Sequence, residues 1–319
     1  MSQAALSVEN LRMSYDGGRS GRILAVNDVS FDVRAGEIFA LLGPNGAGKT
    51  STVKIISGLL IPTTGVVRIM GKDPYVDRTA LKLTGAVLEG TRTLYWRNTC
   101  YENLTYFATL KGMNYKAARQ RALELLARFG LEEKKDVQAR NLSRGMQQKL
   151  AIGASVIHRP ALLLLDEPGL GLDAHAKVDL LAIIREMARE GVAVLLTTHQ
   201  LGMAEELADR VAIVRQGKVV KEESKSELLR RHASNTYEIV LLEMLDAAVT
   251  SSLDSLPFKV RCEGDRIEVD GGTDALYEVL ERIRPARIHH ISRYQSDLQG
   301  IYLKLTNPAW KAENEVSNA

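Results

Sequence analysis

A glycine-rich segment, Gly43-Pro44-Asn45-Gly46-Ala47-Gly48-Lys49-Thr50, has the residue types and the spacing that bind phosphate. It fits the pattern G-x-x-x-x-G-K-[S/T]. The apolar run Ile38–Leu42 precedes it and a helix-like stretch, Lys49–Leu60, follows it. Glycines let successive backbone N–H groups point at one anion, and the positive end of the new helix adds to the attraction. We expect Lys49 to reach the β- and γ-phosphates of a nucleotide and the Thr50 hydroxyl to bind Mg²⁺.

Two acids follow a second apolar run, in which Leu162–Leu165 lead directly into Asp166 and Glu167. A buried strand that ends in two carboxylates is costly unless the acids meet a cation or bonded partners. Asp166 suits a contact to Mg²⁺ through water, and Glu167 is then placed to polarise the attacking water. The simpler interpretation is a pair of acids at a helix N-terminus. His199 also follows a strand-like run, and a lone histidine in that position is usually structural.

The elements that must hold these residues alternate between strand and helix. Helical spacing of apolar residues is found within Glu102–Leu131, Ser143–His158 and Ala176–Glu190, whereas Leu162–Asp166 and Val192–Thr197 have the composition of buried strands. Such alternation favours an α/β fold with a mostly parallel sheet and helices on both faces. We therefore expect one nucleotide-binding domain over residues 1–225.

A smaller region with a different pattern follows a charged, helix-like stretch at Lys221–Ser234. The turn-like Glu263-Gly264-Asp265 joins two strand-like runs, which predicts a hairpin. The order of expected elements is β-α-β-β-α-β, which suggests a small ferredoxin-like sandwich over residues 235–319. The segments that can be assigned are the strands Tyr237–Leu242, Phe258–Cys262, Arg266–Val269 and Arg287–Ser292 and the helices Thr273–Ile283 and Ser296–Leu305, and none of them is the first helix of that order.

Composition excludes several functional classes. Of the 319 residues 45% are hydrophobic and 25% are charged, and 42 Lys and Arg nearly balance 39 Asp and Glu. A net charge of +3 gives no basic footprint, so we expect no nucleic-acid partner. No segment approaches the apolar length of a membrane span, and the first residues lack the apolar core of a signal peptide. The expected compartment is therefore the cytosol.

Further motifs make the resemblance to one family specific. Leu142-Ser143-Arg144-Gly145-Met146-Gln147-Gln148 resembles the LSGGQ signature of ATP-binding-cassette (ABC) transporters, and Leu170-Gly171-Leu172-Asp173 resembles their D-loop. His199 falls at the position of the family's switch histidine, and Tyr15 at that of the aromatic that stacks on adenine. The motifs occur in the family's order, and the resemblance covers roughly residues 5–225. It implies an ABC-type P-loop domain with a helical subdomain at about residues 90–160, followed by a small α+β C-terminal domain.

The resemblance also implies roles for individual residues. Glu167, His199 and Lys49 would be catalytic, and Thr50, Glu89 and Asp166 would hold Mg²⁺. In the family the signature helix contacts the γ-phosphate held by the other subunit, so the expected assembly is a head-to-tail pair of copies with two ATP molecules between them. The expected nucleotide contacts are Tyr15, Gly43, Pro44, Asn45, Gly46, Ala47, Gly48, Lys49, Thr50, Ser51, Ser143, Gly145 and Asp173.

The chain departs from the family pattern at three positions. Glu89 stands where the family usually has Gln, and an ionised Glu accepts hydrogen bonds but cannot donate them. It either binds the metal or points to solvent. Arg144 and Met146 replace Gly and Gln of the signature. Arg144 either adds positive charge near phosphate or lies on the surface.

Among ABC ATPases, Glu89, the LSRGM signature and the C-terminal extension resemble bacterial exporter subunits of the daunorubicin-resistance and nodulation-factor type. The implied partner is an integral-membrane permease on a separate chain, and the implied location is the cytoplasmic face of the membrane. The aromatic stretch Thr91–Leu104 either faces that permease or forms part of the helical subdomain core. Two other functions stay open: a soluble ABC ATPase acting on nucleic acid or ribosomes, and a regulatory subunit that barely hydrolyses ATP.

Overall fold

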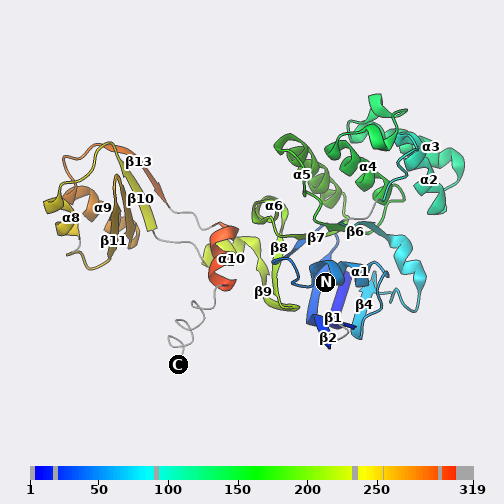
Figure 1. Ribbon diagram of the computed structural model, residues 1–319, viewed down its shortest axis with the longest axis horizontal. Coiled ribbons are helices and arrows are strands. Elements are labelled where there is room, and N and C mark those ends of the chain that lie inside the picture. The colour runs from blue at the N-terminus through cyan, green and yellow to red at the C-terminus, as the bar shows by residue number, and fades with distance from the viewer. Residues whose placement is uncertain are drawn as a thin grey trace. The chain divides into compact units, whose positions relative to one another are not determined.

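The computed structural model describes residues 4–16, 21–89, 93–231, 236–253, 255–293 and 297–306. The chain divides into two compact units, Met1–Lys225 and Ser226–Ala319 (Figure 1). Each unit has a hydrophobic core of its own.

The first unit is built on a six-stranded sheet with the order β5-β6-β7-β3-β8-β9. Its first five strands in that order are parallel, as expected, and β9 is antiparallel to β8. Both faces of the central strands are buried, which explains their continuous apolar sequence. The strands are β3 (Ile38–Leu42), β5 (Thr84–Val87), β6 (Leu162–Asp166), β7 (Ala193–Thr198), β8 (Arg210–Arg215) and β9 (Lys218–Ser224).

One expected helix is partly a strand. The charged stretch Lys221–Ser234 was expected to be helical, but residues 221–224 belong to β9, and the helix α7 begins only at Lys225 and ends at Arg231. A two-residue turn forces this strand back along β8, because Gln216 and Gly217 both have positive φ (49° and 77°). Turns of this kind match the twist of the strands that they connect. Because β9 contains several charged residues, its sequence did not indicate a strand that pairs with β8.

A second, three-stranded antiparallel sheet has the order β2-β1-β4 and contributes to the same core. Its strands are β1 (Ala4–Asp16), β2 (Arg22–Arg34) and β4 (Thr64–Ile69). The helix α1 (Lys49–Ile56) buries Val53, Ile55 and Ile56 in this core. It ends earlier than the expected Leu60, because Gly58 adopts a left-handed φ of 74° and its N–H bonds back to the Ile55 carbonyl.

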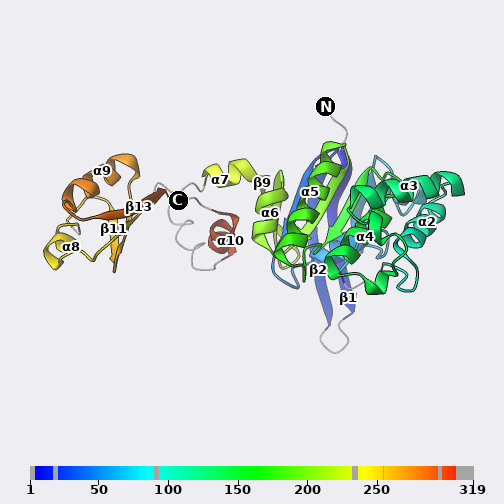
Figure 2. The same cartoon turned by 90° about the horizontal axis from the view of Figure 1, so that it is seen from above.

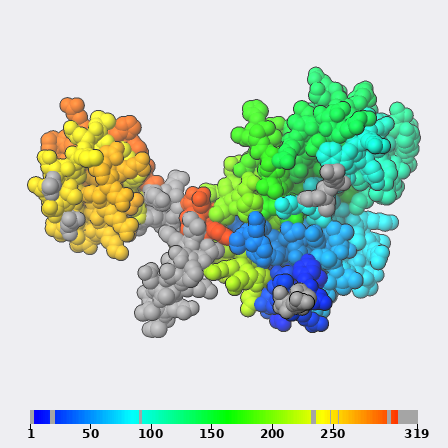
Figure 3. Space-filling model, in the orientation of Figure 1, coloured from blue at the N-terminus to red at the C-terminus, as the bar shows by residue number. Residues whose placement is uncertain are grey.

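The remaining helices of this unit cover the parallel sheet and form a helical lobe (Figures 1 and 2). Figure 3 shows one face of the unit, with the N-terminal strands (blue) at one end and the lobe (cyan to green) at the other. Arg128 ties the lobe to the sheet-covering helix α5 by ion pairs to Glu186 (3.3 Å) and Glu190 (2.9 Å). The helices are α2 (Cys100–Leu110), α3 (Tyr115–Arg128), α4 (Arg144–Val156), α5 (Ala174–Arg189) and α6 (Leu201–Leu207), with short 3₁₀ turns at Arg78–Leu83, Glu132–Lys134 and Ala139–Asn141.

The second unit contains the expected β-α-β-β-α-β order, and its sheet has the order β11-β12-β10-β13 with every pair antiparallel. Ile239, Val269 and Val279 form the centre of its core. His289 and His290 both lie exposed on the edge strand β13. The elements are β10 (Thr236–Leu241), α8 (Ala247–Leu253), β11 (Lys259–Glu263), β12 (Arg266–Asp270), α9 (Gly272–Arg282), β13 (Ile288–Arg293) and, after the sheet, α10 (Leu298–Thr306).

A charge cluster around the buried Glu37 joins strands of both sheets of the first unit. The Arg210 guanidinium lies 3.1 Å from Glu37 and 3.5 Å from Asp32, pairs with Glu222, and sits 5.1 Å above the Phe39 ring. The Glu37 side chain is only 9% exposed, so it depends on Arg210 to offset its desolvation.

We predict that Arg210→Ala lowers the free energy of unfolding by about 3–5 kcal/mol, because it leaves the buried Glu37 carboxylate without a cation. Arg34→Ala is the matched control, since Arg34 is 62% exposed and lies 3.9 Å from Asp32. Its expected cost is at most about 1 kcal/mol. Urea unfolding of both variants measures the two costs, and equal losses would contradict a special role for Arg210.

Candidate functional site

The phosphate loop connects β3 to α1 and packs closely against two other backbone segments. Gly46 and Gly48 have φ values of 79° and 101°, a region that residues with a Cβ rarely adopt. A Cβ on Gly48 would lie 2.2 Å from the Ala25 carbonyl oxygen, and one on Gly43 would lie 2.4 Å from that of Val214. These contacts leave room only for glycine, so the neighbouring strands fix the shape of the loop.

Lys49 points back into its own loop. Its ammonium donates hydrogen bonds to the Gly43 carbonyl (2.7 Å) and the Pro44 carbonyl (3.2 Å), and it lies 3.8 Å from Glu167. Burial lowers the pKa of Lys49 below its ordinary value, whereas the carboxylates of Glu167, Asp166 and Glu89 act in the opposite direction. The loop therefore holds the buried ammonium of Lys49, which donates to two backbone carbonyls. An anion can replace these carbonyls as the acceptor.

Asp166 is 2% exposed at the end of β6. Its Oδ1 accepts hydrogen bonds from the Thr50 hydroxyl (3.2 Å) and from the Thr197 hydroxyl. Its Oδ2 is buried, and no donor among the described residues contacts it. A buried carboxylate oxygen without a partner is unfavourable by itself, so the site has one acceptor ready for a cation or a bound water.

Glu167 is 7% exposed, and its carboxylate lies close to three other side chains. Its Oε1 accepts a hydrogen bond from His199 Nδ1 (2.9 Å) and faces Lys49, and its Oε2 accepts one from the Thr198 hydroxyl (3.1 Å). The backbone at Glu167 has a φ of 50°, unusual for a residue with a side chain. Such strain persists only where the surroundings enforce it, and it concentrates at functional sites.

Thr197 and Thr198 contact the two acids of the site, and the sequence did not single them out. β6 pairs with β7 so that Asp166 lies beside Thr197, and the two hydroxyls therefore reach the two acids. Both threonines are almost fully buried. The sequence does carry a signal, two threonines ending a strand, but its meaning depends on the pairing register.

A cavity of about 320 Å³ opens over the loop. Glu89 is exposed and lines this cavity, although the sequence alone had left open whether it points to solvent. Tyr15 lies just beyond the lining residues, and its hydroxyl hydrogen-bonds the Ser51 hydroxyl at 3.0 Å. The lining residues are Ala25, Asn45, Gly46, Ala47, Gly48, Lys49, Thr50, Ser51, Glu89 and Glu167.

The remaining candidates are not among the residues that line this cavity, and each begins or packs a helix. Ser143 caps α4, where its Oγ accepts from the Met146 N–H (3.3 Å), and Asp173 caps α5 by accepting from the Ala176 N–H (2.8 Å). At Gly145 a Cβ would lie 2.6 Å from the Ala176 Cβ, so this glycine lets α4 approach α5 closely. Ser143 is exposed at the free N-terminus of its helix.

Comparison with known proteins decides the family. Residues 26–169 match the family described as ABC transporter. The daunorubicin/doxorubicin resistance ATP-binding protein of Streptomyces peucetius is 33% identical to the chain, over 95% of the chain and 92% of that protein. The chain belongs to the ABC transporter ATP-binding proteins. The Nod factor export ATP-binding protein I of Bradyrhizobium diazoefficiens is 31% identical, over 96% of the chain and 97% of that protein.

Solved structures place the fold in the same family. An ATP-binding subunit of an ABC transporter aligns with a TM-score of 0.63 at 33% identity, over 71% of the chain and 92% of that structure. A bacterial ABC transporter cassette solved as a dimer aligns with a TM-score of 0.63 at 27% identity, over 69% and 98%. The chain is thus an ABC transporter ATPase of mixed α/β fold, with an added antiparallel C-terminal sheet. Of the residues described, none forms a helix long and apolar enough to cross a bilayer.

The phosphate site of this ABC ATPase fits Mg²⁺. The unpartnered Oδ2 of Asp166, the Thr50 hydroxyl on the same acid and the carboxylate of Glu89 in the cavity wall are all oxygen donors. Within the described ranges no group of three or more acids, histidines or cysteines is placed to hold a metal alone. Mg²⁺ in nucleotide sites takes the rest of its ligands from phosphates and water, so a partial set is what such a site needs.

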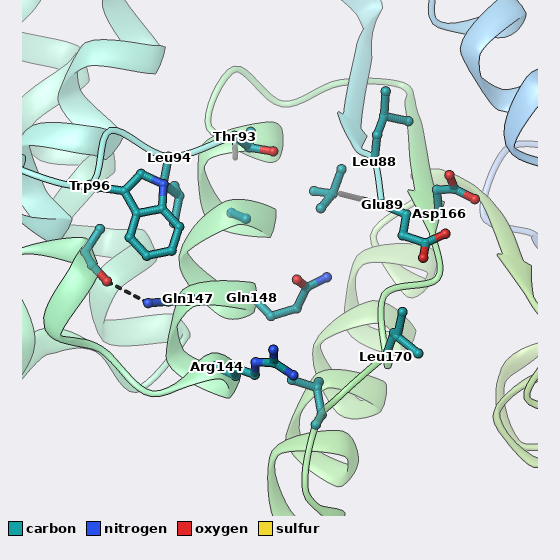
Figure 4. Close-up of a pocket in the computed structure, with 14 residues that line it drawn as sticks. Leu88, Glu89, Thr93, Leu94, Trp96, Arg144, Gln147, Gln148, Asp166 and Leu170 are labelled. Carbon is teal, nitrogen blue, oxygen red and sulfur yellow. Dashed lines mark hydrogen bonds between the residues drawn. The ribbon is translucent and has the colours of Figure 1, made fainter. Parts of the chain in front are cut away.

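A second cavity, of about 340 Å³, lies between α4 and the loops that follow β5 and β6 (Figure 4). Its walls combine apolar side chains with a few polar ones. Glu89 and Asp166 come from the sheet side, whereas Arg144 and Gln148 project from α4. The full lining is Val87, Leu88, Glu89, Thr93, Leu94, Trp96, Ala139, Arg144, Gln147, Gln148, Ala151, Asp166, Leu170 and Leu172.

Proposed function

We propose that two copies of this chain hydrolyse Mg²⁺-bound ATP at their interface and drive export through a separate permease. The observation that carries the proposal is the buried cluster at the phosphate loop, in which Glu167 contacts Lys49 and His199 beside the unpartnered oxygen of Asp166. Phosphoryl transfer to water requires an acid, hydrogen-bond donors and a metal ligand around one phosphate pocket. Glu167 is the acid, Lys49 and His199 are the donors, and Asp166 offers the ligand.

The residues act by position and charge. Lys49 exchanges its bonds to Gly43 and Pro44 for bonds to the β- and γ-phosphates. Thr50, Asp166 and Glu89 would hold Mg²⁺, which would neutralise phosphate charge when bound.

Catalysis follows from the groups that face the γ-phosphate. Glu167, oriented by Thr198, accepts a proton from the attacking water. His199 contacts the Glu167 carboxylate and stabilises the charge that develops on the phosphate. Tyr15, hydrogen-bonded to Ser51, supplies an aromatic face for adenine at the edge of the cavity.

The second half of each site is proposed to come from another copy. Ser143 and Gly145 begin α4 away from the phosphate cavity of their own chain, and a free helix N-terminus attracts anions. A dimeric cassette among the similar structures supports this arrangement. In the head-to-tail pair, the Ser143 helix and the Asp173 loop of one copy face the ATP held by the other.

The permease is proposed to contact the surface around Trp96 at the cytoplasmic face of the membrane. Tyr95 and Trp96 are 49% and 38% exposed, large values for aromatic side chains. Tyr95 also packs edge-on against Tyr106, with ring centroids 4.7 Å apart, so the aromatic stretch is partly anchored in the lobe. Residues 91 and 92 of that stretch lie outside the described residues. Export is proposed because relatives are named for drug resistance and Nod factor export.

Transport can be tested in inside-out vesicles that contain a candidate permease, a polytopic membrane protein produced together with this chain. We expect the purified full chain with Mg²⁺ and ATP to accumulate daunorubicin, followed by its fluorescence, because export from a cell is uptake into such vesicles. Vesicles given Glu167→Gln chain should not accumulate the drug. An ATP-driven release from preloaded vesicles would contradict export, and an ATPase rate that ignores the membrane protein would contradict coupling.

A further inference from the structure

The loop that follows Glu167 lies between the side chains of Met203 and Arg144, and each of these side chains lies against a glycine of the loop. At Gly169 a Cβ would lie 2.2 Å from Cε of Met203, and at Gly171 a Cβ would lie 2.5 Å from Nη1 of Arg144. Met203 is fully buried in α6, and Arg144 is the first residue of α4. The loop therefore runs between α6 and α4, and its two glycines make the space for these side chains.

Arg144 is exposed, and the end of its side chain lies over Gly171. Its Cζ would lie 3.6 Å from a Gly171 Cβ, so the guanidinium covers the glycine backbone. Gly171 has a φ of 73°, which a residue with a side chain rarely adopts. Across the ranges that the structure describes, Arg144 forms neither an ion pair nor a hydrogen bond. Leu170 and Leu172, on either side of Gly171, line the same cavity as Arg144 (Figure 4).

The enclosed loop is tied directly to Glu167. The Leu170 N–H donates to the Glu167 carbonyl (3.1 Å), and the Leu172 N–H donates to the Gly169 carbonyl (3.4 Å). Glu167 itself has a positive φ, so its carboxylate direction depends on a backbone conformation that the loop must maintain. A side chain that presses on the loop therefore influences where the Glu167 carboxylate points.

We propose that Arg144 is a positioning residue for ATP hydrolysis: it presses on Gly171, holds loop 168–172 against Met203, and so aligns Glu167. This inference rests on the proposed role of Glu167. Arg144 directly follows Ser143. In the proposed pair, Ser143 and Glu167 of one chain serve different ATP molecules, so the contact of Arg144 with Gly171 links these two sites. A shift of Ser143 on the partner's nucleotide is thus passed to Glu167 of the same chain.

The test compares Arg144→Gln with Arg140→Gln in the full chain. Arg140 is the matched control, because it is exposed, lies three residues before Ser143, and bonds Gln138. We expect Arg144→Gln to lower kcat about tenfold with KM for ATP changed less than about twofold, since a misplaced group loses rate without losing binding. Arg140→Gln should match the wild type. A kcat of Arg144→Gln within about twofold of wild type would overturn the proposal.

Hydrogen exchange separates positioning from a general loss of structure. In Arg144→Gln, amides of residues 169–172 should exchange faster, while those of β6 and β7 should stay protected. Faster exchange throughout the sheet would mean that the arginine is merely structural, which contradicts the proposal.

A double-mutant cycle tests the Arg144–Gly171 contact itself. Gly171→Ala should slow turnover because its Cβ displaces the guanidinium and strains the backbone. Adding Arg144→Gln should then cause little further loss, since the two changes break one contact. If the two rate factors multiply, the contact plays no part. Glu167→Gln is assayed in parallel: if it keeps full turnover, the proposed catalytic role fails, whereas slow Glu167→Gln with fast Arg144→Gln rejects only this inference.

Discussion

Glu167→Gln is expected to slow ATP hydrolysis by about 10²–10⁴-fold while leaving ATP binding intact, because it removes a general base without changing shape. The glutamine keeps one acceptor oxygen, so it still accepts from one of Thr198 and His199, the two donors that contact Glu167. Single-turnover hydrolysis and equilibrium binding of ATP measure the two properties separately. Glu190→Gln is the control, since Glu190 is an exposed acid that pairs with Arg128 away from the phosphate loop. Full turnover by Glu167→Gln would remove this residue from the proposed mechanism.

Mixing variants shows whether each site is shared between two copies. A chain with Ser143→Ala and a chain with Glu167→Gln should each be slow alone. A mixed pair keeps one site with an intact Glu167 and an intact Ser143. An equal mixture should therefore regain about a quarter of wild-type activity if copies pair at random in a symmetric dimer. If mixing restores nothing although the chains exchange, Ser143 and Glu167 of the same chain serve one ATP, and the shared site is rejected.

Gly48→Ala is expected to abolish ATP binding and to lower the free energy of unfolding by about 3 kcal/mol, because the new methyl has no space and the backbone is strained. Its Cβ would lie 2.2 Å from the Ala25 carbonyl oxygen and 3.5 Å from the Gly217 Cα, so two fixed backbones would have to move. The loop N–H groups would then no longer converge on one phosphate.

Gly46→Ala is the matched comparison for this prediction. Gly46 has a similar positive φ of 79°, but a Cβ there would meet nothing within 4 Å. Its expected cost is the left-handed backbone strain alone, about 1–2 kcal/mol. Urea unfolding and ATP titration of both variants make the comparison. Equal losses would show that backbone strain, and not contact with Ala25, sets the requirement for glycine.

The sequence by itself determined the elements whose signals are local. Apolar runs of five and four residues placed β3 and β6 at their observed bounds, because a strand buried on both faces can hold little else. The phosphate loop could also be predicted from the sequence, since its glycines, Lys49 and Thr50 lie in one continuous segment. Local signals failed at β9, where charged residues form a strand because a turn at Gln216 and Gly217 returns the chain along β8.

Only the tertiary structure decided which distant side chains meet. Pairing of β6 with β7 gives Asp166 and Glu167 their threonine donors, and that register is not written in either segment alone. Gly145 and Gly171 lie within the signature and D-loop motifs, yet their close contacts with Ala176 and Arg144 depend on how helices pack. Arg144 was open between a phosphate contact and a surface position, and the structure places it exposed, with its guanidinium over the loop after Glu167. The sequence thus determined the chemistry of this ATPase, because its motifs are contiguous, whereas the alignment of those motifs depends on contacts between segments far apart in the chain.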